Sequence, residues 1–252
     1  MSDKKLTGRT AVITGASKGL GKAMALALGR AGASLALVSR NKDQLQACAK
    51  EVQDLGVKAE AFQADVTDEA QVARVQKSVI NAFGKVQILI NNAGMNLRKQ
   101  LTDFTLDEWH QVVDTNLTST FLMCRAFVPL MKGQGYGRII NLTSIMSHVA
   151  IGGRTAYCAS KAGLLGFTRA LALELVGEKI TVNGISPGPF ATELNRPILD
   201  NAELNQQFIA KIPVGRWGDA REVGELAVYL CSEDAGFITG TDVLIDGGWT
   251  AQ

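Results

Sequence analysis

The sequence predicts an α/β fold, a doubly wound sheet of seven parallel strands with helices on both faces. Two observations carry this prediction. Strand-like and helix-like segments alternate along the whole chain, and most of the strand-like segments are continuously apolar, as expected for a sheet covered on both faces. No linker, repeat or low-complexity segment interrupts the alternation, so we expect residues 1–252 to form a single domain.

The first part of the chain contains four of the expected strands and the helices between them. Glycines mark the ends of the helices, at Gly32, Gly56 and Gly84. Asp68 or Thr67 is placed to cap the third helix. In order, the elements are a strand at 10–14, a helix at 20–31, a strand at 34–39, a helix at 42–55, a strand at 59–63, a helix ending at 83 and a strand at 86–91.

The second part continues the alternation with longer helices. We expect a helix at 106–131, a strand at 138–143, a helix at 156–176, a strand at 180–185, a helix at 221–231 and a last strand at 242–245. Only the segment 187–213 departs from this pattern, because proline and glycine open it and polar and apolar residues mix within it. A long insertion just past a strand end is usually functional, so we expect a substrate lid there.

Composition excludes several classes of function. The net charge is +2, from 26 basic and 24 acidic residues, which offers no case for binding nucleic acid or an anionic membrane. No apolar run reaches the length of a membrane span, and the polar start lacks the apolar stretch of a signal peptide, so we expect a cytoplasmic protein. Four widely spaced cysteines and two histidines predict buried free thiols and no metal site.

A glycine-rich segment, Thr14-Gly15-Ala16-Ser17-Lys18-Gly19-Leu20-Gly21, joins the first strand to the first helix. Its glycines permit a tight turn and close approach of the backbone to a ligand. The free N–H groups at the start of the helix point at this turn, which predicts a site for the pyrophosphate of a dinucleotide. The alternative is a purely structural turn. The Gly-Lys-Ser/Thr ending of a nucleoside-triphosphate loop is missing.

Ser39 and Arg40 end the second strand, where an NAD site usually carries a carboxylate. An arginine can instead bind a 2′-phosphate through two parallel hydrogen bonds, and Lys18 adds a second positive charge. The sequence therefore predicts that NADP(H) is preferred over NAD(H). The alternative is that Arg40 is a solvated surface charge.

Tyr157 and Lys161 lie four residues apart in an expected helix and therefore share one face. The pKa of a free phenol is about 10, too high for proton transfer at neutral pH. A nearby ammonium group favours the phenolate and lowers that pKa, which would make Tyr157 a general acid or base. Ser144 lies thirteen positions before Tyr157. The alternative is an ordinary helix with these two side chains on one side.

Taken together, these segments resemble the classical short-chain dehydrogenases/reductases over essentially the whole chain. The matching pieces are Thr14-Gly15-x-x-x-Gly19-x-Gly21, Asp65-Val66, Asn91-Asn92-Ala93-Gly94, Asn116, Ser144, Tyr157-x-x-x-Lys161, Asn183 and Pro187-Gly188. The resemblance implies a Rossmann sheet and an oxidoreductase that interconverts a ketone and a secondary alcohol with a nicotinamide cofactor.

The resemblance also implies a role for each matching residue. Tyr157 would donate a proton to the substrate carbonyl oxygen during reduction and remove it during oxidation, while Ser144 would bond that oxygen. Lys161 would lower the pKa of Tyr157 and bond the nicotinamide ribose, and Asn116 would support a water that leads from Lys161 to solvent. The implied cofactor contacts are Gly15, Ser17, Lys18, Gly19, Leu20 and Gly21 in the loop, Ser39 and Arg40, Asp65 and Val66 at the adenine, Asn92, Ala93 and Gly94 under the adenosine ribose, Pro187 and Gly188 at the nicotinamide, Thr192, and Tyr157 and Lys161 themselves. For Asn92 and Gly94, a role as turn residues is the alternative.

The substrate pocket is less sharply predicted. Its candidates are Asn96, Arg98, His148, Arg154, Phe190 and Leu194, with Arg98 placed to pair with a substrate carboxylate. Local phrases such as Asn96-Leu97-Arg98-Lys99 resemble gluconate 5-dehydrogenases, and similar phrases occur in 3-oxoacyl-carrier-protein reductases. We therefore expect a small-molecule substrate, a sugar-acid or polyol-type ketone, with a 3-oxoacyl carrier as one alternative and a non-catalytic NADP-binding sensor or scaffold as another. The family resemblance further implies a homotetramer.

Overall fold

The structure, a computed structural model, describes residues 4–252 apart from the side chain of Leu194. Within this range seven parallel strands form one sheet, in the order β3-β2-β1-β4-β5-β6-β7, which confirms the predicted fold class. The strands are β1 (Thr10–Thr14), β2 (Ser34–Ser39), β3 (Ala59–Gln63), β4 (Ile88–Asn91), β5 (Gly137–Leu142), β6 (Ile180–Pro187) and β7 (Asp242–Ile245).

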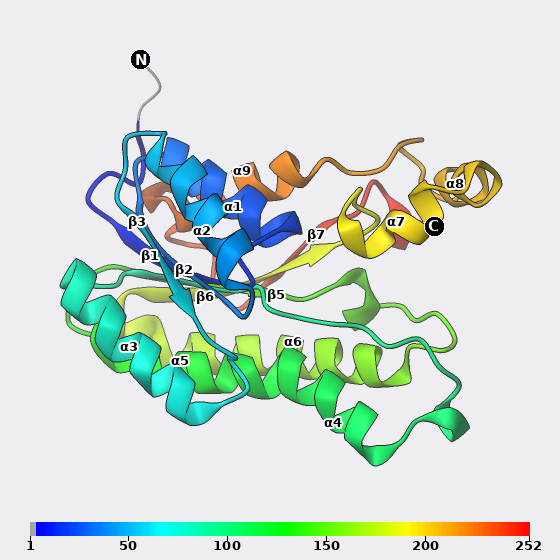
Figure 1. Cartoon of the computed structure of the whole chain (residues 1–252), viewed down its shortest axis with the longest axis horizontal. Coiled ribbons are helices and arrows are strands. Elements are labelled where there is room, and N and C mark those ends of the chain that lie inside the picture. Colours follow the sequence, from blue (N-terminus) through cyan, green and yellow to red (C-terminus); the bar gives the residue numbers. More distant parts are fainter. Residues whose placement is uncertain (1–3) are drawn as a thin grey trace.

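Helices cover both faces of the sheet (Figure 1). One face carries α1 (Gly19–Arg30), α2 (Lys42–Gln53) and α9 (Ala220–Cys231), and the other carries α3 (Glu69–Phe83), α5 (Ser119–Met131) and α6 (Thr155–Leu175). Neighbouring residues of a strand point to opposite faces, so Ile13 packs in the core cluster that contains Leu28 and Val12 in the cluster that contains Phe127. Two apolar layers therefore fix the sheet between its helices.

The strand order reverses at β1. The chain runs outward from β1 through β2 to β3 and then crosses back, so that β4 pairs with the other edge of β1. In open parallel sheets, ligands bind beside the carboxyl ends of the strands at such a reversal. The glycine-rich loop follows β1, and Asn92 follows β4, so both lie at this point.

The predicted helix at 106–131 is divided into three parts. It comprises α4 (Leu106–Val113), a π-helical turn η2 (Asp114–Thr118) and α5. Asn116 lies in the π turn, where its side chain accepts a hydrogen bond from Met95 N (2.8 Å) and donates one to Met95 O (3.0 Å). Such turns inside α-helices occur frequently at functional sites. Helical periodicity alone does not reveal this extra residue per turn.

The segment 187–213 contains two short helices, α7 (Arg196–Leu199) and α8 (Ala202–Ile209), beside one end of the sheet (Figure 1). Phe208 of α8 stacks on Trp217, with ring centroids 4.8 Å apart, and also contacts Trp249, at 5.3 Å. The segment is therefore fastened to the carboxyl-terminal end of the chain. Across residues 4–252, no helix is both long enough and apolar enough to cross a membrane.

Candidate active site

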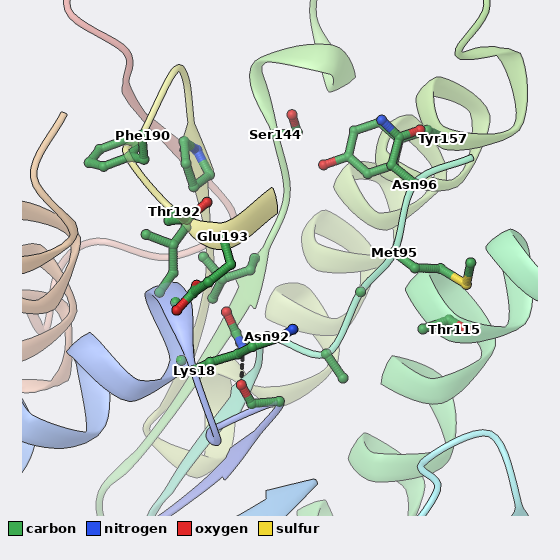
Figure 2. A pocket seen from close by; sticks show the side chains of 18 of the residues that line it. Lys18, Asn92, Met95, Asn96, Thr115, Ser144, Tyr157, Phe190, Thr192 and Glu193 are labelled. Carbon is green, nitrogen blue, oxygen red and sulfur yellow. Dashed lines mark hydrogen bonds between the residues drawn. The ribbon is translucent and has the colours of Figure 1, made fainter. Parts of the chain in front are cut away.

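A cavity of about 690 Å³ opens beside the carboxyl ends of the strands (Figure 2). All of the residues predicted to contact the cofactor line it. They are Gly15, Ser17, Lys18, Gly19, Leu20, Gly21, Ser39, Arg40, Asp65, Val66, Asn92, Ala93, Gly94, Tyr157, Lys161, Pro187, Gly188 and Thr192. Segments that are far apart in the sequence thus contribute to one site.

The glycine-rich loop fits the pyrophosphate of a dinucleotide. Gly15 has a φ of +63°, and a Cβ there would lie 2.7 Å from Asn92 Nδ2. A Cβ on Gly21 would lie only 2.3 Å from the carbonyl oxygen of Gly15, so the backbone can be this compact only with glycine. No side chain caps the start of α1 at Lys18, which leaves the first N–H groups available to an anion.

Asn92 holds the same loop from the end of β4. Its Nδ2 donates to Thr14 O (2.9 Å) and to Gly15 O (3.1 Å), while the backbone N–H groups of Asn92 and Ala93 both donate to Thr14 Oγ1 (3.0 Å each). Asn92 therefore stabilises the turn, as the structural alternative states, and it also lines the cavity.

Arg40 lies at the rim of the cavity with its side chain 70% exposed. Its Nη1 is 3.8 Å from Asp65 Oδ2, which is a weak, solvent-screened pair. Asn41 and Gln44 line the cavity beside it. A guanidinium that is held only loosely can turn toward a phosphate without breaking a strong ion pair.

Ser144 and Tyr157 meet in the cavity. Ser144 Oγ accepts a hydrogen bond from Met146 N (3.1 Å), so its own proton is free to be donated elsewhere. Figure 2 shows the Tyr157 ring directed toward Ser144. Burial raises the pKa of Tyr157, while the hydrogen bond from Ser144 and the charge of Arg154 act to lower it.

Lys161 is buried, with 4% of its surface exposed, and its Nζ donates to Leu142 O at the end of β5. Desolvation lowers its pKa to about 8, and the nearby charge of Asp242 opposes that shift. Nζ lies 5.8 Å from the centre of the Tyr157 ring. The pKa of Tyr157 is raised, opposite to the expected lowering, because burial outweighs the hydrogen bond from Ser144 and the charge of Arg154.

Asn116 lies behind the cavity rather than on its wall, and it is 1% exposed. Besides its two bonds to the Met95 backbone, its Nδ2 donates to Ser160 Oγ (2.9 Å). A Cβ on Gly94 would lie 3.2 Å from Asn116 Oδ1 and 3.6 Å from Lys161 Nζ, which places Gly94 between these two polar groups.

Four of the six substrate candidates line the cavity, namely Asn96, Arg98, Arg154 and Phe190. His148 does not line it, because its ring is turned onto Asp242, with Nε2 2.6 Å from Oδ2. The structure therefore does not bring His148 to the cavity wall with the other candidates. The side chain of Leu194 lies outside the described residues.

Several further lining residues were not named singly from the sequence, among them Glu193, Asn195, Phe208 and Trp249, although the first three lie in the predicted lid segment 187–213. Glu193 and Asn195 follow the predicted Thr192 closely, so proximity in the chain was an available signal. Phe208 and Trp249 carry no spacing signal, because they come together only through the tertiary fold. Within residues 4–252, no group of three or more His, Cys, Asp or Glu side chains is placed to hold a metal ion.

Comparison with known proteins places this site in a family. Residues 15–250 match the family described as enoyl-(acyl carrier protein) reductase. The chain is 36% identical to D-beta-hydroxybutyrate dehydrogenase of Rhizobium meliloti, over 97% of this chain and 99% of that protein. It is 34% identical to the 3-oxoacyl-acyl-carrier-protein reductase of Escherichia coli, over 96% and 97% of the two chains.

Among solved structures, a gluconate 5-dehydrogenase from Burkholderia cenocepacia, in complex with NADP and tartrate, superposes with a TM-score of 0.94. It is 33% identical and covers 99% of this chain and 98% of its own. The fold and the matched length show that the chain belongs to the classical short-chain dehydrogenase/reductase family. It is an oxidoreductase that acts on an alcohol or ketone with a nicotinamide cofactor.

Proposed function

We propose that the protein is an NADP(H)-dependent enzyme that reduces a ketone to a secondary alcohol, or runs the reverse reaction, with Tyr157 as general acid/base. The observation that carries this proposal is the convergence of Ser144, Tyr157 and Lys161 on one cavity. When bound, the nicotinamide supplies or accepts the hydride. The residues of the chain provide the proton for the carbonyl oxygen, hold the substrate in position and supply a positive charge near the reacting atoms.

The proposed steps follow from the hydrogen bonds at the site. Ser144 Oγ accepts a hydrogen bond from Met146 N–H and keeps its own proton, which it donates to the substrate carbonyl oxygen to polarise it. Tyr157 gives its proton to the same oxygen as negative charge develops there. Lys161 donates one N–H to Leu142 O, so its other N–H groups remain available to the ribose. Its ammonium group places a positive charge near the phenol of Tyr157. Asn116 holds the Met95 segment in place behind them.

The test is Tyr157→Phe, with Tyr229→Phe as the matched control. Tyr229 lies on the surface of α9 and is 44% exposed, so the same loss of a hydroxyl there leaves the site intact. We expect Tyr157→Phe to lower kcat by about 10²–10⁴-fold, a larger effect than its effect on NADPH binding, where it removes one contact among many. Ketone turnover at the wild-type rate in Tyr157→Phe would show that the proposed mechanism is wrong.

The preference for NADP(H) is proposed from Arg40 and Lys18. Both line the cavity, and Arg40 is held only by its 3.8 Å pair with Asp65. The Burkholderia gluconate 5-dehydrogenase, a relative in structure, is in complex with NADP. We expect Arg40→Ala to weaken NADPH binding by about tenfold while NADH binding changes little. Arg74→Ala, on exposed α3, is the control, and equal affinities of the wild type for NADH and NADPH would overturn the preference.

The proposed substrate class is a ketone that carries a carboxylate and hydroxyl groups, as a sugar acid does. Arg98 and Arg154 both line the cavity, so two cations face one space. Desolvation, and after it the charge of Arg98, lowers the pKa of Arg154. Asn96 Oδ1 is a buried acceptor with no partner among the described residues, and a substrate hydroxyl would satisfy it. The similar gluconate 5-dehydrogenase structure contains tartrate, a hydroxy acid.

A screen of purified protein with NADPH against sugar acids, neutral ketones and 3-oxoacyl thioesters would test the class. We expect Arg154→Met to raise KM at least about tenfold for ketones with a carboxylate and to leave KM for neutral ketones nearly unchanged. The similarity to 3-oxoacyl-acyl-carrier-protein reductases makes the thioester the second candidate. Arg125, one basic residue that a carrier protein could contact, is paired with Glu69, which favours the smaller substrate.

We also propose a cytoplasmic homotetramer. The free cysteines suit a reducing compartment, because all four are unpaired and three are buried. Small residues form an exposed face of α6, with Ala159, Ala162, Gly163 and Gly166, where a second copy could pack closely. Exposed apolar side chains occur elsewhere at Phe237 and Leu244, and we propose a second contact surface there. Sedimentation of a stable monomer at micromolar concentration would exclude this assembly.

A further inference from the structure

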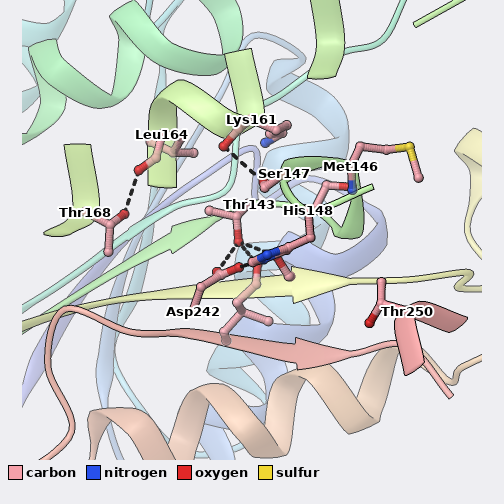
Figure 3. A network of polar contacts seen from close by, with 12 residues as sticks. Thr143, Met146, Ser147, His148, Lys161, Leu164, Thr168, Asp242 and Thr250 are labelled. Atoms are coloured by element: carbon pink, nitrogen blue, oxygen red, sulfur yellow. Dashed lines mark hydrogen bonds and ion pairs between the residues drawn. The ribbon is translucent and has the colours of Figure 1, made fainter. Parts of the chain in front are cut away.

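Asp242 sits at the centre of a buried polar network below the cavity (Figure 3). Its side chain is 3% exposed. Oδ1 accepts a hydrogen bond from Thr143 Oγ1 (2.5 Å), and Oδ2 accepts one from Ser186 Oγ (2.5 Å). His148 Nε2 lies 2.6 Å from Oδ2 and donates to it in the tautomer that carries the proton on that nitrogen. A buried carboxylate with three donors is fixed in one orientation.

The three donors belong to segments that carry the reaction. Thr143 directly precedes Ser144, and Ser186 directly precedes Pro187. These residues lie on or just after the ends of the adjacent strands β5 and β6, and Asp242 begins β7, the next strand in the sheet. The carboxylate therefore connects the serine side of the cavity to its nicotinamide side.

A glycine in the neighbouring strand leaves room for the Asp242 carboxylate. Gly184 of β6 is the register partner of Asp242, and a Cβ on Gly184 would lie 2.0 Å from Asp242 Oδ1. Thr143 Oγ1 would lie 3.2 Å from the same Cβ. The pairing of a glycine with an aspartate thus permits the close packing that the network requires.

Asp242 also lies near the buried lysine, because Lys161 Nζ donates to Leu142 O and Leu142 directly precedes Thr143, whose hydroxyl donates to Asp242. Its titratable neighbours are His148, from the segment after β5, and Lys161, from α6. Desolvation lowers the pKa of Lys161, and the negative charge of Asp242 opposes this. An unpaired ammonium in the interior is costly, so a fixed carboxylate nearby favours the charged form.

We propose that Asp242 is a positioning residue for the reaction, because its carboxylate locks the Ser144 and Pro187 segments together and provides a fixed negative charge near Lys161. The proposal rests on the proposed function for the roles of Ser144 and Lys161. His148 completes the arrangement through the contact of its Nε2 with the same carboxylate.

The first test needs no substrate. Protein labelled with ¹³C at the lysine ε-carbon is titrated by NMR, and the Lys161 signal is assigned from its loss in Lys161→Arg. We expect Asp242→Asn to lower the titration midpoint of Lys161 by about one pH unit, because the amide keeps the size of the side chain but removes the charge. Asp54→Asn, at a carboxylate that caps the C-terminal end of α2 and is 61% exposed, is the control and should leave the midpoint unchanged. An unchanged midpoint in Asp242→Asn would overturn the electrostatic part of the proposal.

The second test measures kcat as a function of pH with any ketone that the wild type reduces. In Asp242→Asn we expect kcat to fall about tenfold and its alkaline limb to move to lower pH, since Lys161 loses its proton earlier. A role in folding alone would lower stability without moving that limb. If the screen finds no ketone, the proposed function fails while the NMR titration still decides the influence on Lys161.

Variants of His148 keep the proposal testable if Asp242→Asn does not fold. The side chain of His148 is 29% exposed, so changes there are tolerable. His148→Leu removes one donor and should lower kcat several-fold, whereas His148→Gln retains an N–H donor and should restore kcat to within about twofold. Equal, wild-type kcat in both variants would contradict the proposed locking of the Ser144 segment.

Discussion

Replacing Gly21 by alanine should weaken NADPH binding strongly and lower the thermal stability only moderately. The new methyl group would meet the carbonyl oxygen of Gly15 at 2.3 Å and Asn92 Nδ2 at 2.5 Å. Real Cβ atoms essentially never approach closer than 3.0 Å, so the Gly15 carbonyl and the amide of Asn92 must both move. That movement breaks the bond from Asn92 to Gly15 and opens the loop.

The size of the effect follows from these contacts. Overpacking a tight site costs about 1–3 kcal/mol. For a chain of this length each kcal/mol lowers Tm by about 2–4 °C, so we expect Tm to fall by about 2–12 °C. Loss of one charge-assisted bond to the pyrophosphate removes about 1.5–3 kcal/mol of binding free energy, which corresponds to about 10- to 150-fold weaker NADPH binding.

NADPH fluorescence titration and thermal unfolding measure the two effects on the same samples. Gly177→Ala is the control, because a Cβ there meets nothing within 4 Å and its backbone φ is ordinary. We expect that variant to bind NADPH as the wild type does. A folded Gly21→Ala protein with wild-type affinity for NADPH would refute the placement of the pyrophosphate on this loop.

Three further predictions follow from buried or paired groups. The buried Tyr136 phenol donates to Cys231 O, so Tyr136→Phe should lower the free energy of unfolding by about 1–3 kcal/mol in urea titrations. Burial raises the pKa of the Cys231 thiol to about 12, so iodoacetamide near neutral pH should label the half-buried Cys158 and spare Cys231, as peptide mass spectrometry would show. The hydrogen bond from Arg216 lowers the pKa of Glu222 to about 2, so its stabilisation is present above the ordinary carboxyl pKa and is lost as pH falls toward 2. Stability measured from pH 5 to 2 should therefore decline less steeply in Glu222→Gln.

The parts of the site that were predicted from sequence are local in the chain or have a fixed spacing. The glycine loop lies within eight residues, and Tyr157 and Lys161 share one helical turn, so their types and positions already indicate their chemistry. The alternation of apolar strands with helices likewise predicted the fold class, because each element buries its apolar face next to its neighbours in the chain.

The parts that were missed depend on long-range contacts. His148 and Asp242 are 94 positions apart, and only the order of β5, β6 and β7 brings them together. Asn116, in the π turn, bonds to the backbone of Met95, which lies outside the helix and 21 positions earlier in the chain. The direction of the Tyr157 pKa depends on how deeply the phenol is buried, which the spacing of Tyr157 and Lys161 does not specify.

The ring contacts of Phe208 have a practical consequence for handling the protein. Trp249 lies three residues from the last residue and packs against Phe208, while Gln252 Nε2 donates to Lys211 O just after α8. Trp249 and Phe208 both line the cavity, so a purification tag fused after residue 252 would lie close to the cavity wall and could disturb the contact between these two rings. Enzymology on this chain is therefore best done with the tag at the amino terminus or removed by cleavage.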